Sequence, residues 1–122
     1  MELIRWSTVL SDVRDLYFVK LTDDGVLRYT IETRLKEVYE VVLGNYCGPY
    51  VVVDEEHLTK YWSIKGENIG STFEVRNSPL IDYFSGINDY DDYKHYVIAT
   101  WDVCLEVLSA REPVIRRVEN KN

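Results

Sequence analysis

A tight reversal between two apolar segments constrains the fold of this chain more than any other feature. Residues 16–21 and 26–31 are rich in β-branched and aromatic side chains, and Thr22-Asp23-Asp24-Gly25 separates them. Glycine after aspartate readily takes the positive φ that a tight turn needs. Segments joined by so short a turn pair only in the antiparallel sense. The sequence therefore predicts a β-hairpin here and an antiparallel sheet around it.

Five more strands are predicted further along the chain. Residues 50–53 form a short β-branched run with the length of a buried strand, and residues 72–76 alternate between apolar and polar side chains. The apolar runs 95–100 and 103–108 are separated by two residues, which is hairpin spacing. A proline precedes the last run, 114–118, and suits an edge strand. Because these closing strands leave little room for crossover helices, we expect a largely antiparallel sheet.

The start of the chain carries apolar side chains at near-helical spacing. This spacing predicts a helix over residues 3–13 that packs one stripe of side chains inward. An extended conformation over residues 6–10 is the alternative. The residues that set the spacing are Leu3, Trp6, Leu10 and Val13, with Val9 and Leu16 beside them.

A second helix is predicted over residues 33–44, where Thr33 can cap the start and Gly44 the end. One face of this helix would carry the apolar side chains, and the charged residues would lie elsewhere. Because Val41 and Val42 are β-branched, a long strand through Val42 is the competing interpretation. The apolar residues of the helical face are Leu35, Val38, Tyr39, Val42 and Leu43.

Two shorter helices are predicted in the middle of the chain. Asp54 is followed by two glutamates, which places negative charge at a helix start and gives a helix over residues 54–65. Ser78 before Pro79 is a suitable cap and first helical residue, and this pair predicts a helix that ends at Gly86.

Taken together, these elements predict an α+β fold with a largely antiparallel sheet and about four short helices on one face. The chain of 122 residues has the length of one ordinary domain, and its apolar residues are spread along it. We expect a single domain over residues 1–118 and a flexible tail over residues 119–122.

The charge balance of the chain restricts its partners. Fourteen basic and twenty-one acidic residues give a formal net charge of −7, which repels a phosphate backbone, so we expect no nucleic-acid partner. No segment approaches the roughly 18 apolar residues of a membrane helix, and the first residues lack a signal-peptide pattern. We expect a cytoplasmic protein without membrane association, whose two cysteines, Cys47 and Cys104, are reduced thiols.

An acidic and aromatic segment, residues 81–93, is the main candidate for a binding site. It carries four carboxylates and no basic residue before Lys94. Tyrosine offers a rigid amphipathic contact, and aspartate supplies a long-range attraction for a cationic partner. An ordinary solvated loop can have the same composition. The residues expected to bind a partner are Asp82, Tyr83, Asp89, Tyr90, Asp91, Asp92 and Tyr93.

Recognisable motifs for catalysis, cofactors and metals are missing from the sequence. His57 and His95 are the only histidines, and neither belongs to a metal-ligand spacing. Cys47 lies in a predicted turn without a known nucleophile signature around it. A calcium loop counted from Asp89 lacks the glycine and the glutamate that such a loop needs. We therefore predict no catalytic residue, no cofactor and no metal.

The combination of acidic charge, many tyrosines and missing motifs predicts a non-catalytic protein-protein interaction module. Its expected class is an inhibitor or immunity-type antidote that binds a basic partner. A small enzyme or small-molecule-binding domain that uses Cys47, His57 and His95 is the first alternative. The second is a structural accessory subunit or a homo-oligomer, such as a homodimer, whose last strand pairs edge to edge, although the arginines on that strand oppose such pairing.

Overall fold

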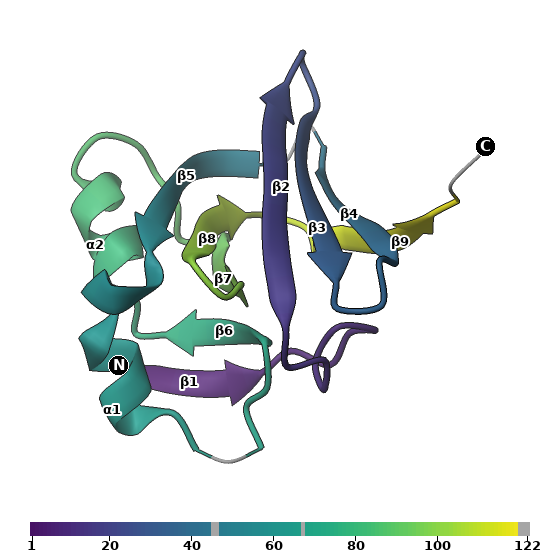
Figure 1. Ribbon diagram of the computed structural model, residues 1–122. Helices are drawn as coiled ribbons and strands as arrows, with labels where there is room; N and C mark the ends of the chain where they lie inside the picture. Colours follow the sequence, from purple (N-terminus) through teal and green to yellow (C-terminus); the bar gives the residue numbers. More distant parts are fainter. Residues whose placement is uncertain (45–46, 67, 120–122) are drawn as a thin grey trace.

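The pairing of the strands produces two antiparallel sheets, not one (Figure 1). The computed structural model describes residues 1–44, 47–66 and 68–119, without the side chains of His57 and Lys60. Within these residues the larger sheet has five strands. Their order across the sheet is β1 (Glu2–Arg5), β6 (Thr72–Arg76), β7 (Lys94–Ala99), β8 (Val103–Ser109) and β5 (Cys47–Asp54).

The second sheet is built on the predicted hairpin. The side chains of Asp23 and Asp24 accept hydrogen bonds from the backbone N–H groups of Gly25 and Val26, and Gly25 has a φ of 101°. These bonds and the positive φ fix the turn. In the described part of the chain this sheet has four strands. Their order is β2 (Leu16–Asp23), β3 (Leu27–Thr33), β4 (Val38–Leu43) and β9 (Val114–Val118).

The main hydrophobic core lies between the two sheets. Leu27, Tyr29 and Ile31 of β3 are buried in one cluster with Leu105 and Val107 of β8. Because side chains alternate across a strand, one face of each sheet supplies this core. Removal of this apolar area from water is the main favourable contribution to folding.

The outer face of the five-stranded sheet carries the helices. A short 3-10 helix, η1 (Glu55–His57), leads into α1 (Thr59–Ile64), and α2 (Pro79–Ser85) follows β6. In Figure 1 both α-helices lie at the left, on the side away from β3 and β4. Tyr61 of α1 contacts Phe73 of β6 edge to face, with ring centroids 5.8 Å apart, in a second buried cluster. The larger sheet is therefore covered on both faces.

The helix predicted over residues 3–13 is wrong. Strand β1 occupies the start of this segment and pairs antiparallel with β6, and a loop follows it. Hydroxyl groups shape the loop, because Ser11 Oγ and Thr72 Oγ1 both donate to the Trp6 carbonyl oxygen, over 2.9 and 2.7 Å. The loop buries Trp6 and Leu10 in the core. A turn, and not a helix, thus produces their four-residue spacing.

The helix predicted over residues 33–44 is also wrong, and the competing strand is correct. Strand β4 pairs with β3 on one side and with β9 on the other. Lys36, at a φ of 67°, lies in the turn before β4, and Leu35 is 81% exposed instead of facing inward. Val41 and Leu43 are buried, which is the two-residue period of a strand.

The other predicted elements are confirmed. The hairpin, the five later strands and the two shorter helices all occur, and β9 is an edge strand. Because two of the four predicted helices are absent from the described chain, the fold is mostly β and not the expected α+β. No helix in this part of the chain is long and apolar enough to cross a membrane. Residues 120–122 of the predicted tail lie outside the described residues.

Candidate functional site

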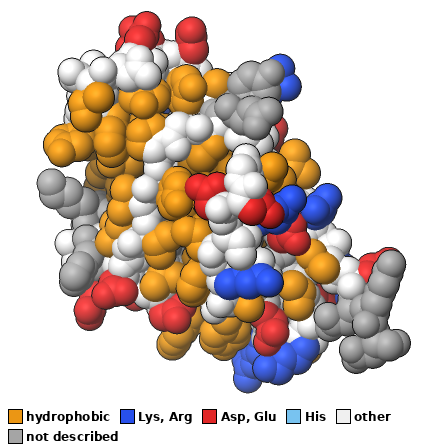
Figure 2. Space-filling model, turned by 90° about the horizontal axis from the view of Figure 1, so that it is seen from above, with side chains coloured by type: hydrophobic (Ala, Val, Ile, Leu, Met, Phe, Trp, Pro, Cys, Tyr) orange, Lys and Arg blue, Asp and Glu red, His pale blue; other side chains and the backbone are white. Residues whose placement is uncertain are grey.

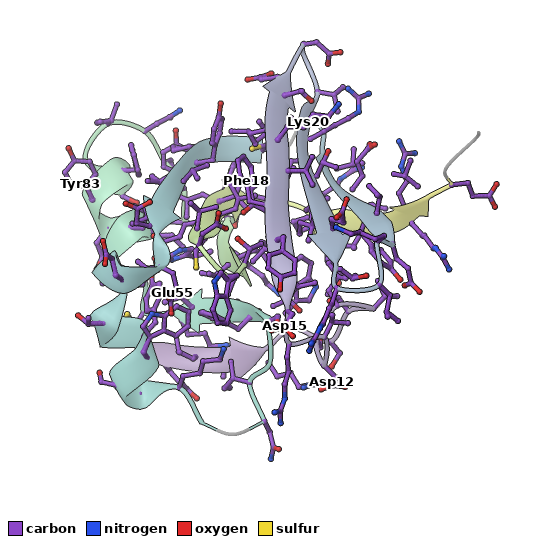
Figure 3. All side chains as sticks on the ribbon, viewed as in Figure 1. Asp12, Asp15, Phe18, Lys20, Glu55 and Tyr83 are labelled. Atoms are coloured by element: carbon purple, nitrogen blue, oxygen red, sulfur yellow. The ribbon has the colours of Figure 1, made fainter. Side chains whose placement is uncertain are left out.

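The predicted partner-binding residues belong to α2 and to the loop that follows it. Ser78 caps α2, and its Oγ accepts a hydrogen bond from the Ile81 N–H. The loop rises at the upper left of Figure 1 before the chain enters β7. Tyr83 is 72% exposed, and Figure 3 shows its side chain pointing away from the body of the protein. Ile87, at 78% exposure, adds a second large apolar side chain.

The aspartates of this segment present negative charge that no ion pair with another described residue neutralises. In contrast to Glu40, which pairs with Arg28 and Arg116, none of them forms an ion pair with another described residue. Asp89 Oδ1 accepts a hydrogen bond from the Asp91 N–H over 2.9 Å, which holds the loop in a turn. The exposed aspartates are Asp82, Asp89, Asp91 and Asp92.

The two remaining predicted tyrosines pack against the protein itself. Tyr90 and Tyr93 meet edge to face with ring centroids 5.0 Å apart, and Phe84 contacts Tyr90 at 6.4 Å. Both tyrosine rings lie against Gly48 of β5, where an added Cβ would come within 3.2 Å of Tyr90 and 3.0 Å of Tyr93. The predicted site therefore has an exposed part, which contains Tyr83 and the aspartates, and a half-buried part that anchors the loop to β5.

Hydrophobic side chains gather on one face near this loop. Figure 2 shows them over the left half of the molecule seen from above, which is the side of α2 and β5 in Figure 1, with acidic side chains at the border. Apolar surface beside unpaired carboxylates suits a partner that is both cationic and amphipathic.

A buried polar network, which the sequence patterns did not reveal, lies on the outer face of the larger sheet beside α2. His95 of β7 connects two other side chains, since its Nδ1 is 2.7 Å from Ser78 Oγ and its Nε2 is 2.9 Å from Glu106 Oε1. The Tyr61 hydroxyl donates to the same Oε1 over 2.5 Å. His95 is fully buried, and Glu106 is only 7% exposed. The network thus joins α1, α2, β7 and β8.

The hydrogen bonds of this network meet at Glu106. Ser78 Oγ accepts from the Ile81 N–H and lies within hydrogen-bond distance of His95 Nδ1. Glu106 Oε1 accepts from the Tyr61 hydroxyl and lies within hydrogen-bond distance of His95 Nε2. Burial, followed by the hydrogen bond to Glu106 and its charge, raises the pKa of Tyr61 well above its usual range.

Ser78, His95 and Glu106 are residue types that form hydrolase triads, but here the serine is not accessible to a substrate. A serine nucleophile must reach its substrate. Ser78 is 3% exposed, and its oxygen serves as the cap of α2. The network therefore acts as a buried set of hydrogen bonds that holds the two helices on the sheet.

A hollow of about 350 Å³ opens between α1 and α2, directly beside the network. Its walls are mainly apolar and aromatic, and Glu106 contributes the one acidic side chain among the residues that line it. The other residues that line it are Met1 at the start of the chain, Leu58, Thr59 and Tyr61 on the α1 side, and Pro79, Leu80 and Tyr83 on the α2 side.

The sequence does contain a signal for this site. Glu106 is the only charged residue in β8, between apolar neighbours on both sides. In a sheet that is covered on both faces, a charged side chain in the middle of a strand must be buried and must find partners. The sequence patterns predict helices on one face of a single sheet, so they do not predict that Glu106 is buried.

The residues of the predicted enzyme alternative do not come together in the described structure. Cys47 pairs with Ser109 and packs against the core between the sheets, whereas His95 pairs with Leu108, the residue before Ser109 in β8. Because neighbouring residues of a strand face opposite sides, Cys47 and His95 lie on opposite faces of the sheet. Burial raises the pKa of Cys47 to about 11. The side chain of His57 lies outside the described residues.

Neither metal-ligand geometry nor known relatives add to this description. No group of three or more His, Cys, Asp or Glu side chains in the described chain is placed to hold a metal ion. Comparison with protein-family models, with curated protein sequences and with solved structures finds no match in any of the three.

Proposed function

We propose that this protein is a non-catalytic module that binds a basic protein, in the manner of an inhibitor or an immunity-type antidote. One observation carries the proposal: exposed aspartates that form no ion pair with another described residue lie beside exposed apolar side chains on α2 and its loop. We call these residues the acidic surface. It consists of Asp82, Tyr83, Ile87, Asp89, Asp91 and Asp92.

The two kinds of side chain on the acidic surface favour binding in different ways. The aspartates attract a cationic partner over distance and raise the rate of encounter. Tyr83 loses water on contact, and buried tyrosines are among the residues that contribute most to interface energies. Because Tyr90 and Tyr93 already hold the loop against β5, less conformational freedom is lost on binding.

The test is an affinity pull-down from the source cell at low and at high salt, followed by measurement of the Kd for each basic protein recovered. We expect the wild-type chain to recover a basic protein at low salt and to lose it as screening increases. A variant in which the acidic surface has lost its charge should weaken the Kd by about tenfold or more. Its substitutions are Asp82→Asn, Asp89→Asn, Asp91→Asn and Asp92→Asn.

A matched control removes the same number of negative charges at exposed positions elsewhere. We expect this control to retain most of the affinity, because the aspartates of the acidic surface are unchanged. Equal losses in both variants would assign the binding to net charge alone, and full retention by the asparagine variant would overturn the proposal. The control substitutions are Glu2→Gln, Asp23→Asn, Asp102→Asn and Glu119→Gln.

A further inference from the structure

The carboxyl group of Glu106 is buried, and among the described residues no lysine, arginine or terminal amine pairs with it. Its one ion-pair contact is with the imidazole of His95, which is itself fully buried. Buried charges in proteins are normally paired, because an isolated one is costly to remove from water.

One oxygen of Glu106 is open to the hollow between α1 and α2. Both donors of the network, Tyr61 and His95, bond to Oε1. In the described chain every buried side-chain nitrogen or oxygen has a hydrogen-bond partner. Oε2, which receives none of the network's hydrogen bonds, is therefore not fully buried. Since Glu106 lines the hollow, its free oxygen faces that space.

The remaining walls of the hollow suit an apolar stem that ends in a cation. Leu58, Pro79 and Leu80 offer aliphatic contact, and the rings of Tyr61 and Tyr83 can face a cation. A volume of about 350 Å³ admits a small ligand or one long side chain.

We propose that this hollow binds a single alkylammonium or guanidinium group on an apolar stem, with Glu106 Oε2 as the acceptor of its hydrogen bond. Two sources supply this chemistry, a free small amine and a lysine or arginine side chain of another protein. The inference goes beyond the acidic surface, because its counter-charge is the buried Glu106 and not the exposed aspartates. An experiment can therefore contradict binding in the hollow without contradicting binding at the acidic surface, and the reverse.

The experiment is an NMR titration of the wild-type protein with n-butylammonium, n-butylguanidinium and the neutral analogue n-butanol. We expect saturable shifts at the amides of Leu58, Tyr61 and Leu80 with the two cations, and binding of butanol that is weaker by about tenfold or more. The variant Glu106→Gln keeps the shape and the acceptor for both donors but removes the charge. In this variant the preference for the cations over butanol should disappear.

A second variant keeps the proposal testable if Glu106→Gln does not fold. Thr59 is exposed where it lines the hollow, so Thr59→Lys places an internal ammonium there without changing the buried network. We expect this variant to lose about tenfold in affinity for butylammonium. The matched control, Thr22→Lys, adds the same charge on β2 of the other sheet and should bind as the wild type does.

Capped amino acids distinguish the two sources of the cation. Comparable binding of Nα-acetyl-lysine methylamide would support a protein side chain as the ligand, and binding of butylammonium alone would support a free amine. The asparagine variant of the acidic surface should still bind the amine, which separates the two proposals. No saturable binding of either cation, equal affinity for butanol, or unchanged cation preference in Glu106→Gln would overturn the inference.

Discussion

Tyr61 shows how one side chain attaches a short helix to a sheet. Its ring packs edge to face on Phe73, and its hydroxyl donates to the carboxylate of Glu106. The helix that carries it has only six residues, which is too short to be stable by itself.

The variant Tyr61→Phe tests this role. It keeps the ring and removes the donor, so we expect the free energy of unfolding to fall by about 1–3 kcal/mol. The control Tyr83→Phe makes the same chemical change at an exposed ring and should stay within about 0.5 kcal/mol of the wild type. Urea denaturation measures both values, and equal stabilities of the two variants would contradict the assigned role.

The two cysteines should react slowly in the folded protein. Burial raises the pKa of Cys47 to about 11 and, as the largest of several effects, that of Cys104 to about 12, and the reactive form of a cysteine is the thiolate. Alkylation by iodoacetamide at neutral pH should therefore be slow for Cys47 and slower still for the fully buried Cys104. Mass spectrometry across a pH series would show labelling of Cys47 increase toward pH 11. Labelling of Cys47 at neutral pH as fast as in urea-unfolded protein would contradict this expectation.

At the scale of elements, two loops far apart in sequence are joined through their backbones. The Ser71 N–H donates to the Ser11 carbonyl oxygen over 2.9 Å, and Ser71 Oγ donates to the Val13 carbonyl oxygen over 2.7 Å. Gly70 makes this approach feasible, because its φ is 78° and an added Cβ would lie 2.3 Å from the Ser11 oxygen. The loop after β1 thus depends on a segment that precedes β6.

The variant Gly70→Ala should destabilise the protein by at least about 2 kcal/mol, because it combines a left-handed φ with a clash against backbone. Gly66→Ala is the control, since nothing lies within 4 Å of its added Cβ and its φ is not positive. That control should be neutral or stabilising by up to about 1 kcal/mol. Thermal unfolding compares the two, and a neutral Gly70→Ala would show that the loops can separate without loss.

The elements that local sequence patterns predicted well are those that local interactions determine. The turn around Gly25 and the cap at Ser78 form bonds within a few residues, so the hairpin and α2 follow from the sequence. The segment over 3–13 failed because Thr72, which is distant in sequence, helps to shape its loop. Over residues 33–44, the apolar pattern is compatible with both the helical period and the two-residue period of a strand, and the helical interpretation is wrong.

The candidate site could be predicted only in part for the same reason. The exposed aspartates lie in one short segment, residues 82–92, and charge alone indicates that they are solvated. Tyr61, Ser78, His95 and Glu106 come from four different elements, and their meeting depends on how the helices fold back over the sheet. No spacing in the sequence encodes that arrangement.

At the scale of the whole molecule, buried tyrosine and cysteine side chains make the free energy of unfolding depend on pH in the alkaline range. Burial is the largest effect that raises the pKa of Tyr96 and of Cys104 to about 12, and it also raises the pKa values of Tyr29 and Tyr61. Folding favours the neutral forms of these groups. Their contribution to the free energy of unfolding is therefore complete below the ordinary pKa values, 9.0 for cysteine and 10.0 for tyrosine. This contribution is lost as the pH rises toward the pKa values of the folded state.

We therefore expect the free energy of unfolding to decrease as the pH increases from about 9 to 12. Lys65 acts in the opposite direction, because burial lowers its pKa and the fold favours its neutral amine, but it is one group against five, since burial also raises the pKa of Cys47. Urea denaturation at pH 8, 10 and 11 would measure the change. A constant free energy of unfolding over this interval would show that these groups gain access to water without loss of the fold.

The pairing of β1 with β6 has a consequence for synthesis on the ribosome. Leu3 lies opposite Val75, and β5, at the other edge of the described sheet, pairs with β8, which is made later still. The first strand of the larger sheet must therefore remain without its neighbour until more than half of the polypeptide has been translated. A nascent chain that stalls before β6 would expose unpaired strand edges to other copies, so release from the ribosome and folding of this sheet are nearly simultaneous events.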